Sequence, residues 1–167
     1  MDRNEWGTPQ WGYDYLDAEF CFTLDPCATH ENFKCARYYT KEDDGLKQSW
    51  ANSRVFINPP YGRGLLEPWI DKALEEAHYN CLSVLLLPAR TAQPWYHRCM
   101  RQAREIRFVE GRISYVPPPG VKASQPREDT IIVIVRPVKL VTRRLLVSSV
   151  LRTDMEKGAA GNPRARR

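Results

Sequence analysis

The stretch that decides the fold is Arg54-Val55-Phe56-Ile57-Asn58-Pro59-Pro60-Tyr61-Gly62. Its first four residues form a β-branched and aromatic run, which is typical of a strand. The two prolines and the glycine then prevent that strand from continuing, because proline has no backbone N–H to donate to a sheet. Asn58 is therefore predicted to lie at the carboxyl end of a strand.

Short apolar runs alternate with helical spacings on both sides of this stretch. The pattern predicts helices that run from Pro68 to about Ala77 and from Trp95 to Ala103, and strands at residues 22–24, 54–57, 83–87, 106–109, 113–116 and 130–135. The run 83–87 is apolar throughout, as in a strand that is buried on both faces. Such alternation predicts an α/β fold, with helices packed on both faces of a sheet.

Two polar segments follow predicted strands. Asp25-Pro26 comes after residues 22–24, and Asn58 comes after residues 54–57. Open α/β sheets bind their ligands beyond the carboxyl ends of the strands. Both segments are therefore expected at one edge of the sheet, around a common site.

The composition is that of one globular domain. With 167 residues, 43% of them hydrophobic, the chain can bury a core without disulfides or a structural metal. No run approaches the roughly 20 apolar residues of a membrane span, and no basic flank with an apolar stretch opens the sequence. We expect a cytoplasmic protein that neither spans nor binds a membrane.

Positive charge gathers in the second half of a chain whose net charge is +5. Residues 1–85 carry more Asp and Glu than Lys and Arg, whereas residues 86–167 have the opposite excess. Such asymmetry indicates a polyanionic partner, although a solvated basic tail produces it as well. We predict a folded domain at residues 1–140 and a basic, partly mobile C-terminal extension at residues 141–167.

The five cysteines are odd in number and show no C-x-x-C spacing, which favours reduced thiols in a cytoplasmic chain. Cys27, His30 and Cys35 can be grouped as zinc ligands, but a structural zinc site requires a fourth ligand at a specified spacing. We therefore expect no metal.

The residue types of Asn58-Pro59-Pro60-Tyr61 suit the methylation of an exocyclic amine. The side-chain carbonyl of Asn58 and the main-chain carbonyl of Pro59 can accept the two N–H hydrogens of that amine. Tyr61 can stack on a base that is turned out of its duplex. The reaction is then a direct displacement at the methyl group of a sulfonium donor, assisted by positioning. A tight turn without catalytic function is the alternative interpretation.

An ordered series of blocks resembles the phage DNA N-6-adenine-methyltransferase (phage Dam) family over most of residues 5–135. The blocks are Glu5 to Trp11, Phe22 to Thr29, Lys34 to Thr40, Asp43 to Leu46, Asn58 to Gly62, Leu86 to Thr91 with Trp95, and Glu110 to Arg112. The resemblance implies a Rossmann-like methyltransferase that takes its methyl group from S-adenosylmethionine and leaves N6-methyladenine at specific sites in double-stranded DNA. For a phage-encoded enzyme, the host cytoplasm is the implied location.

Carried over onto this chain, the resemblance makes Asn58, Pro59, Pro60 and Tyr61 the catalytic motif. It also implies that a second set of residues forms the donor pocket, namely Thr8, Pro9, Asp25, Pro26 and, for the adenosine of the donor, Asp44. A carboxylate such as Asp25 at a strand end can pair with the donor's ammonium group or accept from its ribose hydroxyls. Thr8-Pro9 is also typical of a helix start before Trp11.

The chain departs from common methyltransferases in one respect. Asp25-Pro26-Cys27-Ala28 stands where they carry a glycine-rich turn, and too few residues separate Asp25 from Asn58 for two further strands with their helices. We therefore expect an abridged sheet on that side.

Arg63, Arg90 and Arg112 flank the predicted motifs and are candidates for phosphate contacts, which give affinity without sequence information. An ion pair inside the fold is an alternative role for Arg90. The proline-rich residues 116–124 are a candidate for reading the DNA sequence, since the chain has no long insertion.

Two other functions remain open at this point. Asn-Pro-Pro-Tyr also serves enzymes that methylate a glutamine side chain in proteins or bases in RNA. An inert nucleic-acid-binding module that kept the fold is the other alternative, and binding of the donor distinguishes it from an enzyme.

Overall fold

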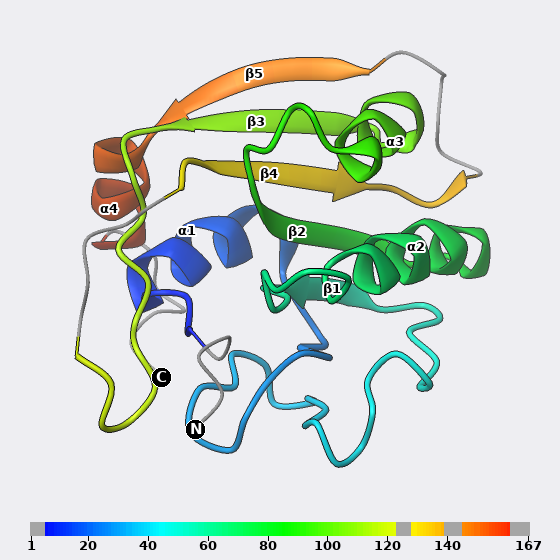
Figure 1. The fold of residues 1–167 in the computed structure, drawn as a ribbon, viewed down its shortest axis with the longest axis horizontal. Coiled ribbons are helices and arrows are strands. Elements are labelled where there is room, and N and C mark those ends of the chain that lie inside the picture. Colours follow the sequence, from blue (N-terminus) through cyan, green and yellow to red (C-terminus); the bar gives the residue numbers. More distant parts are fainter. Residues whose placement is uncertain (1–5, 123–127, 139–144, 161–167) are drawn as a thin grey trace.

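The computed structural model describes residues 6–122, 128–138 and 145–160 of the chain. In chain order, its elements are α1 (Gln10–Phe20), β1 (Arg54–Ile57), α2 (Glu67–Glu76), the 3-10 turn η1 (Ala77–Tyr79), β2 (Leu82–Pro88), α3 (Pro94–Gln102), β3 (Glu105–Glu110), β4 (Thr130–Val135), β5 (Leu146–Leu151) and α4 (Arg152–Ala160). The five strands form one mixed sheet in the order β1-β2-β4-β3-β5 (Figure 1). Strand β1 is parallel to β2 and β3 is parallel to β5, whereas β4 runs antiparallel to both of its neighbours.

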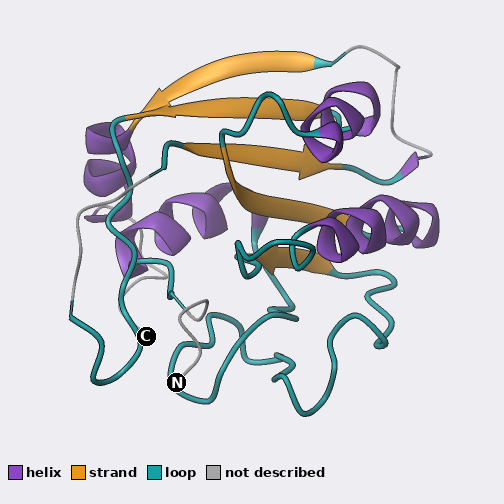
Figure 2. Ribbon diagram, in the orientation of Figure 1, coloured by secondary structure: helices purple, strands orange, loops and turns teal. Residues whose placement is uncertain are grey.

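Helices cover both faces of the sheet, as Figure 2 shows, and each face has its own hydrophobic core. Successive residues of β2 alternate between the cores, with Leu85 on the side of α2 and α3, and Leu86 on the side of α1 and α4. Strand β4 is buried along its whole length. The predicted α/β architecture with helices on both faces is therefore confirmed. The continuous apolar runs indicated it, because a strand in a sheet with two covered faces is buried on both sides.

Helix α1 begins at Gln10, directly after Pro9, so Thr8-Pro9 does precede a helix start. The helix ends at Phe20, and the capping residue Cys21 has a left-handed φ of 51°. Asp17 Oδ1 accepts a hydrogen bond from the backbone N–H of Phe22 at 2.7 Å. Tyr13, Leu16 and Phe20 of this helix are buried against the sheet.

Two of the predicted strands are not strands in the structure. Residues 22–24 contribute only an isolated parallel bridge between Leu24 and Val55, because the following segment turns away at Pro26. Residues 113–116 contribute only an antiparallel bridge between Val116 and Gly7, because the chain leaves β3 at Gly111, whose φ is 89°. The sheet is therefore abridged beyond β1, as expected.

The sheet extends beyond the domain boundary predicted at residue 140. Strand β5 pairs with β3 in parallel register, and α4 packs on α1 with Met155 fully buried. The composition predicts a basic, partly mobile extension at residues 141–167, because basic residues dominate this segment and β5 is too exposed to show an alternating apolar pattern. Residues 161–167 lie outside the described part of the chain.

Candidate active site

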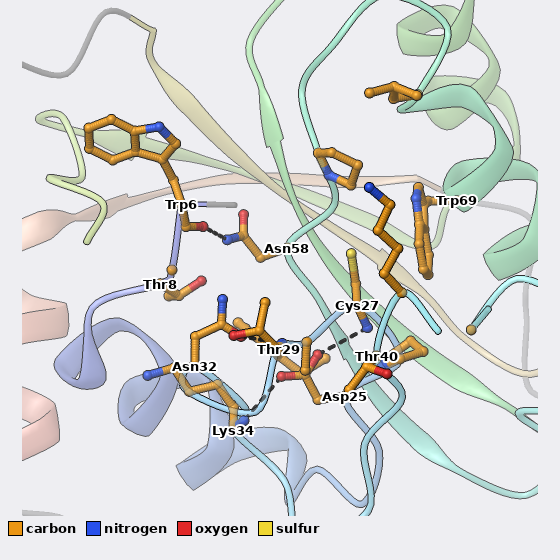
Figure 3. Close-up of a pocket in the computed structure, with 18 of the residues that line it drawn as sticks. Trp6, Thr8, Asp25, Cys27, Thr29, Asn32, Lys34, Thr40, Asn58 and Trp69 are labelled. Carbon is orange, nitrogen blue, oxygen red and sulfur yellow. Dashed lines mark hydrogen bonds between the residues drawn. The ribbon is translucent and has the colours of Figure 1, made fainter. Parts of the chain in front are cut away.

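A cavity of about 270 Å³ lies beyond the carboxyl end of β1, beside the segment that follows Leu24 (Figure 3). Its wall is built from residues 6–8, parts of the loop 25–45, the end of β1, and the start of α2. Six residues that the sequence singled out line it together, namely Thr8, Asp25, Pro26, Asp44, Asn58 and Pro60. The two polar segments, one after the bridge residue Leu24 and the other after β1, thus meet at one edge of the sheet.

Three other predicted site residues lie outside the lining. Pro9 caps the N-terminus of α1, and Pro59 is buried. Tyr61 is anchored to the sheet, because its hydroxyl donates to the carbonyl oxygen of Leu86 at 3.1 Å. The motif therefore presents Asn58 and Pro60 to the cavity, while the end of the Tyr61 side chain is held by β2.

The amide of Asn58 has a fixed orientation. Its Nδ2 donates to the main-chain carbonyl of Trp6 at 2.7 Å, the contact drawn beside the cavity in Figure 3. An asparagine amide has one donating nitrogen and one accepting oxygen. With the nitrogen occupied by Trp6, Oδ1 remains as the acceptor for a ligand.

Asp25 is a buried carboxylate, 4% exposed, and it orders the loop around it. Its Oδ1 accepts from the backbone N–H of Cys27 at 3.3 Å, and its Oδ2 accepts from that of Lys34 at 3.1 Å. Burial raises the pKa of Asp25 to about 6, and the two backbone hydrogen bonds oppose that rise. Since each carboxylate oxygen accepts more than one hydrogen bond, Asp25 retains capacity for a ligand.

Thr8 carries an orphaned polar atom. Its hydroxyl is buried, and within the described residues it has no hydrogen-bond partner, although the residue lines the cavity. Buried hydroxyls are nearly always hydrogen-bonded, and an exception in a cavity wall points to a group supplied by a ligand.

Asp44 reaches the cavity because Gly45 brings its loop against Pro26. A Cβ added at Gly45 would lie 2.0 Å from the carbonyl oxygen of Pro26, so only glycine fits. Trp50 also holds this loop in place, since its Nε1 donates to the carbonyl of Gly45 at 2.9 Å. The ring of Trp50 in turn stacks on that of Trp69, which lines the cavity, with 6.1 Å between centroids.

Sequence reasoning missed several residues of the lining. Trp6 and Lys34 lie in blocks that carried the family resemblance, so their neighbourhood gave a signal that was not assigned to them. The helical spacing around Trp69 predicts an apolar helix face, and a single sequence offers nothing to separate that role from a cavity wall. The other lining residues that were missed are Gly7, Cys27, Ala28, Thr29, Asn32, Thr40, Lys41, Gly45, Phe56 and Leu65.

The three predicted arginines lie outside the cavity lining, and two of them have carboxylate partners. Arg90 forms a two-pronged ion pair with Glu128, in which Nε lies 2.8 Å from Oε2. Arg112 pairs with Asp129 at 3.0 Å, in a contact that is more than half exposed on both sides. Arg63 is exposed. Arg90 thus has an ion-pair partner, as in its alternative role, but both side chains of the pair are more than a third exposed. Residues 123 and 124 of the proline-rich segment lie outside the described residues.

The zinc grouping is not assembled. Cys35 Sγ lies 3.6 Å from the hydroxyl of Tyr13, and His30 Nδ1 lies 3.0 Å from that of Tyr38. Within residues 6–122, 128–138 and 145–160, no three His, Cys, Asp or Glu side chains are placed to hold a metal ion. In the same part of the chain, no helix combines the length and apolar character that a membrane crossing needs.

Comparison with a solved structure shows the fold. A Listeria monocytogenes protein, provisionally described as a class I S-adenosylmethionine-dependent methyltransferase, superimposes with a TM-score of 0.53. The match covers 90% of this chain and 67% of that protein at 11% sequence identity. The abridged five-stranded sheet is therefore Rossmann-like.

Comparisons of sequence show the family. The chain is 32% identical over 114 residues to a DNA N-6-adenine-methyltransferase of Escherichia phage T1. That match covers 67% of this chain and 47% of the T1 protein. The chain is also 31% identical over 119 residues to an enzyme of the same description from Haemophilus phage HP1, in a match that covers 69% of this chain and 68% of that protein. The chain thus spans about half the length of the T1 relative. The model of the family described as DNA N-6-adenine-methyltransferase (Dam) matches residues 1–161, and the chain therefore belongs to that family.

Proposed function

We propose that this chain transfers the methyl group of S-adenosylmethionine to the N6 amine of adenine at specific sites in double-stranded DNA. The observation that carries the proposal is the hydrogen bond from Asn58 to Trp6, because it leaves the Asn58 oxygen as an acceptor beside the cavity. Membership of the adenine methyltransferase family supports the choice of adenine in DNA. The site of action is the cytoplasm of the host cell.

The residues of the cavity suit the methyl donor. Asp25 and Lys34 supply opposite charges for the amino and carboxylate groups of its methionine part, and the hydroxyl of Thr8 lacks the partner that such a group provides. Asp44 can accept from the ribose hydroxyls, and Trp69 offers an aromatic surface for the adenine ring. When bound, S-adenosylmethionine supplies a methyl group attached to a positively charged sulfur.

Asn58 and Pro59 prepare the amine for attack. The Oδ1 of Asn58 and the main-chain carbonyl of Pro59 accept its two N–H hydrogens, which turns the nitrogen lone pair toward the methyl carbon. The new N–C bond forms as the S–C bond breaks, S-adenosylhomocysteine leaves, and the surplus proton of the amine passes to water. Tyr61, held at its hydroxyl by Leu86, keeps its ring in place for stacking on the target base.

Arg63, Arg90 and Arg112 contribute phosphate contacts along the duplex in this proposal. Arg63 supports that role best, because it is exposed and the structure records no ion pair to it among the described residues. Arg90 and Arg112 share their charge with carboxylates, so each contributes less.

Mass spectrometry of nucleosides tests the proposal. Unmethylated duplex DNA is incubated with the protein and S-adenosylmethionine, and we expect N6-methyladenine that is absent with Asn58→Ala. Gln102→Ala, at an exposed amide side chain of α3 outside the cavity, is the control and should form product. Donor binding without product would favour an RNA or protein substrate, and absence of both would favour an inert module.

A further inference from the structure

Tyr115 lies outside the Asn58-Pro59-Pro60-Tyr61 motif but contacts its last residue. The two tyrosine hydroxyls are 3.1 Å apart, and the rings meet edge to face with 6.1 Å between centroids. Tyr115 also lies 3.4 Å from the hydroxyl of Thr130, at the start of β4. Tyr115 therefore connects the motif to a strand at the centre of the sheet.

The direction of these hydrogen bonds follows from counting hydrogens. The hydroxyl of Tyr61 has one hydrogen, which it donates to the carbonyl of Leu86. Tyr115 must then donate its own hydrogen to Tyr61, and Thr130 must donate to Tyr115. The result is a one-way chain that starts at Thr130 and ends on a main-chain carbonyl of β2. Every hydroxyl hydrogen in it is used.

The next residue, Val116, holds the opposite end of the motif. Its backbone N–H donates to the carbonyl of Gly7 at 2.8 Å, and its carbonyl accepts from the N–H of Gly7 at 2.8 Å. Gly7 follows Trp6, whose carbonyl orients the amide of Asn58. Consecutive residues thus hold the two ends of the motif, one through a side chain and the other through the backbone.

We propose that Tyr115 is a positioning residue for methyl transfer, and that Tyr115 and Val116 together fix the distance between the amide of Asn58 and the ring of Tyr61. The inference rests on the proposed function. Asn58 binds the amine and Tyr61 stacks on the same base, so their separation decides whether the amine lies in line with the methyl group. Small displacements of this kind reduce the rate far more than they reduce binding. The segment that carries Tyr115 is itself anchored, because Ile113 is buried in the core beside α1.

Tyr115→Phe tests the side-chain contact. It keeps the ring and removes the hydroxyl that donates to Tyr61 and accepts from Thr130. We expect kcat to fall about fivefold while the Kd for S-adenosylmethionine stays within twofold. Tyr79→Phe is the matched control, since Tyr79 is 58% exposed and lies away from the cavity. A merely structural role would lower the melting temperature and leave kcat per active site unchanged, and that result overturns the proposal.

A double-mutant cycle shows whether Tyr115 acts through Tyr61. In a Tyr61→Phe background, the additional Tyr115→Phe change should have little further effect on kcat, because the hydroxyl that Tyr115 holds is already absent. Independent, additive losses would overturn the proposal. If the wild-type chain makes no N6-methyladenine, the proposed function itself is contradicted. If the wild type is active and the Tyr115→Phe variant is unimpaired, only the role of Tyr115 is contradicted.

Val116→Pro tests the backbone contact, because proline deletes the N–H that Gly7 accepts. Val116→Ala retains that N–H and measures the contribution of the side chain alone. We expect the proline variant to lower kcat at least fivefold more than the alanine variant, and to weaken donor binding, since Trp6, Gly7 and Thr8 line the cavity. Equal effects of the two substitutions would contradict the role of Val116.

Discussion

The side-chain amide of Asn58 donates to the main-chain carbonyl of Trp6, 52 residues earlier in the chain. The contact joins the segment before α1 to the end of β1 and leaves the Asn58 oxygen as an acceptor. It requires a hydrogen-bond donor at this position, which aspartate does not supply at neutral pH.

Asn58→Asp should therefore impair this chain although the carboxylate has nearly the same shape. The ionised oxygen would face the Trp6 carbonyl, an arrangement of two acceptors, and we expect a tenfold or greater loss in the single-turnover rate of methylation. Asn52→Asp is the control, because the Asn52 oxygen accepts from Asn80 and a carboxylate can do the same. A fully active Asn58→Asp variant would show that the Trp6 contact does not set the orientation.

Asp25 should make the stability of the protein decrease as the pH rises from about 4 to about 6. Burial raises the pKa of Asp25 from 3.8 to about 6, so in this range the folded protein keeps a proton that the unfolded chain releases. The free energy of unfolding should fall by about 3 kcal/mol at most across the range and then stay level, by the conversion of about 1.4 kcal/mol per pKa unit.

Urea denaturation of the wild type and of Asp25→Asn at several pH values measures this effect. The variant lacks the titrating group, so the stability of the wild type relative to the variant should drop between pH 4 and 6. A relative stability that is constant or rises with pH would mean that burial does not dominate the ionisation of Asp25.

Thr8→Val should have opposite effects on folding and on binding. The substitution removes a buried hydroxyl that has no partner among the described residues, so the melting temperature without ligand should be unchanged or higher. The Kd for S-adenosylmethionine, measured by calorimetry, should rise about fivefold, the cost of one hydrogen bond.

Thr40→Val is the matched comparison for Thr8→Val. Thr40 also lines the cavity, but its hydroxyl donates to Asp43 at 2.9 Å, so its loss should lower the melting temperature. If Thr8→Val is the destabilising change of the two, the Thr8 hydroxyl has a partner within the protein.

Arg63→Ala should weaken DNA binding without affecting stability. Removal of one phosphate contact reduces affinity about equally for all sequences and lowers the slope of log K against log salt by about 1. Arg90→Ala should instead lower the melting temperature as well, because Glu128 loses its guanidinium partner. Fluorescence anisotropy with a labelled duplex at several salt concentrations separates the two, and an unchanged slope for Arg63→Ala would exclude its phosphate contact.

The chain's local chemistry predicted strands β1 to β4 and helices α2 and α3, because their apolar residues recur at strand or helix spacing. Strands β1, β2 and β4 and helix α2 follow from continuous apolar runs and from prolines that end or begin them. Strand β5 and helix α4 could not be predicted in the same way, because β5 is an exposed edge whose partner, β3, lies far away in sequence. Its place is decided by tertiary pairing rather than by local pattern.

The cavity shows the same division. Asn58 follows β1, and Asp25 follows Leu24, which forms a bridge to β1. The end of such a short apolar run is a position that the sequence can indicate. The orienting role of Trp6 depends on a main-chain carbonyl, which is the same for every residue type, so no sequence pattern can report it. Trp69 likewise lines the cavity only because its helix packs beside Trp50.

One wall of the cavity contains no regular secondary structure. Between Phe20 and Arg54 the structure has neither helix nor strand, and the loop is held by single contacts such as those of Asp25 and Gly45. Segments of this kind open at a lower free energy than a sheet does, so this wall and the sheet behave as separate cooperative units. Amide hydrogens of residues 26–50 should exchange by local opening, while those of β2 and β4 exchange only on global unfolding. A ligand in the cavity should slow the exchange of residues 26–50 toward the rate of β2 and β4.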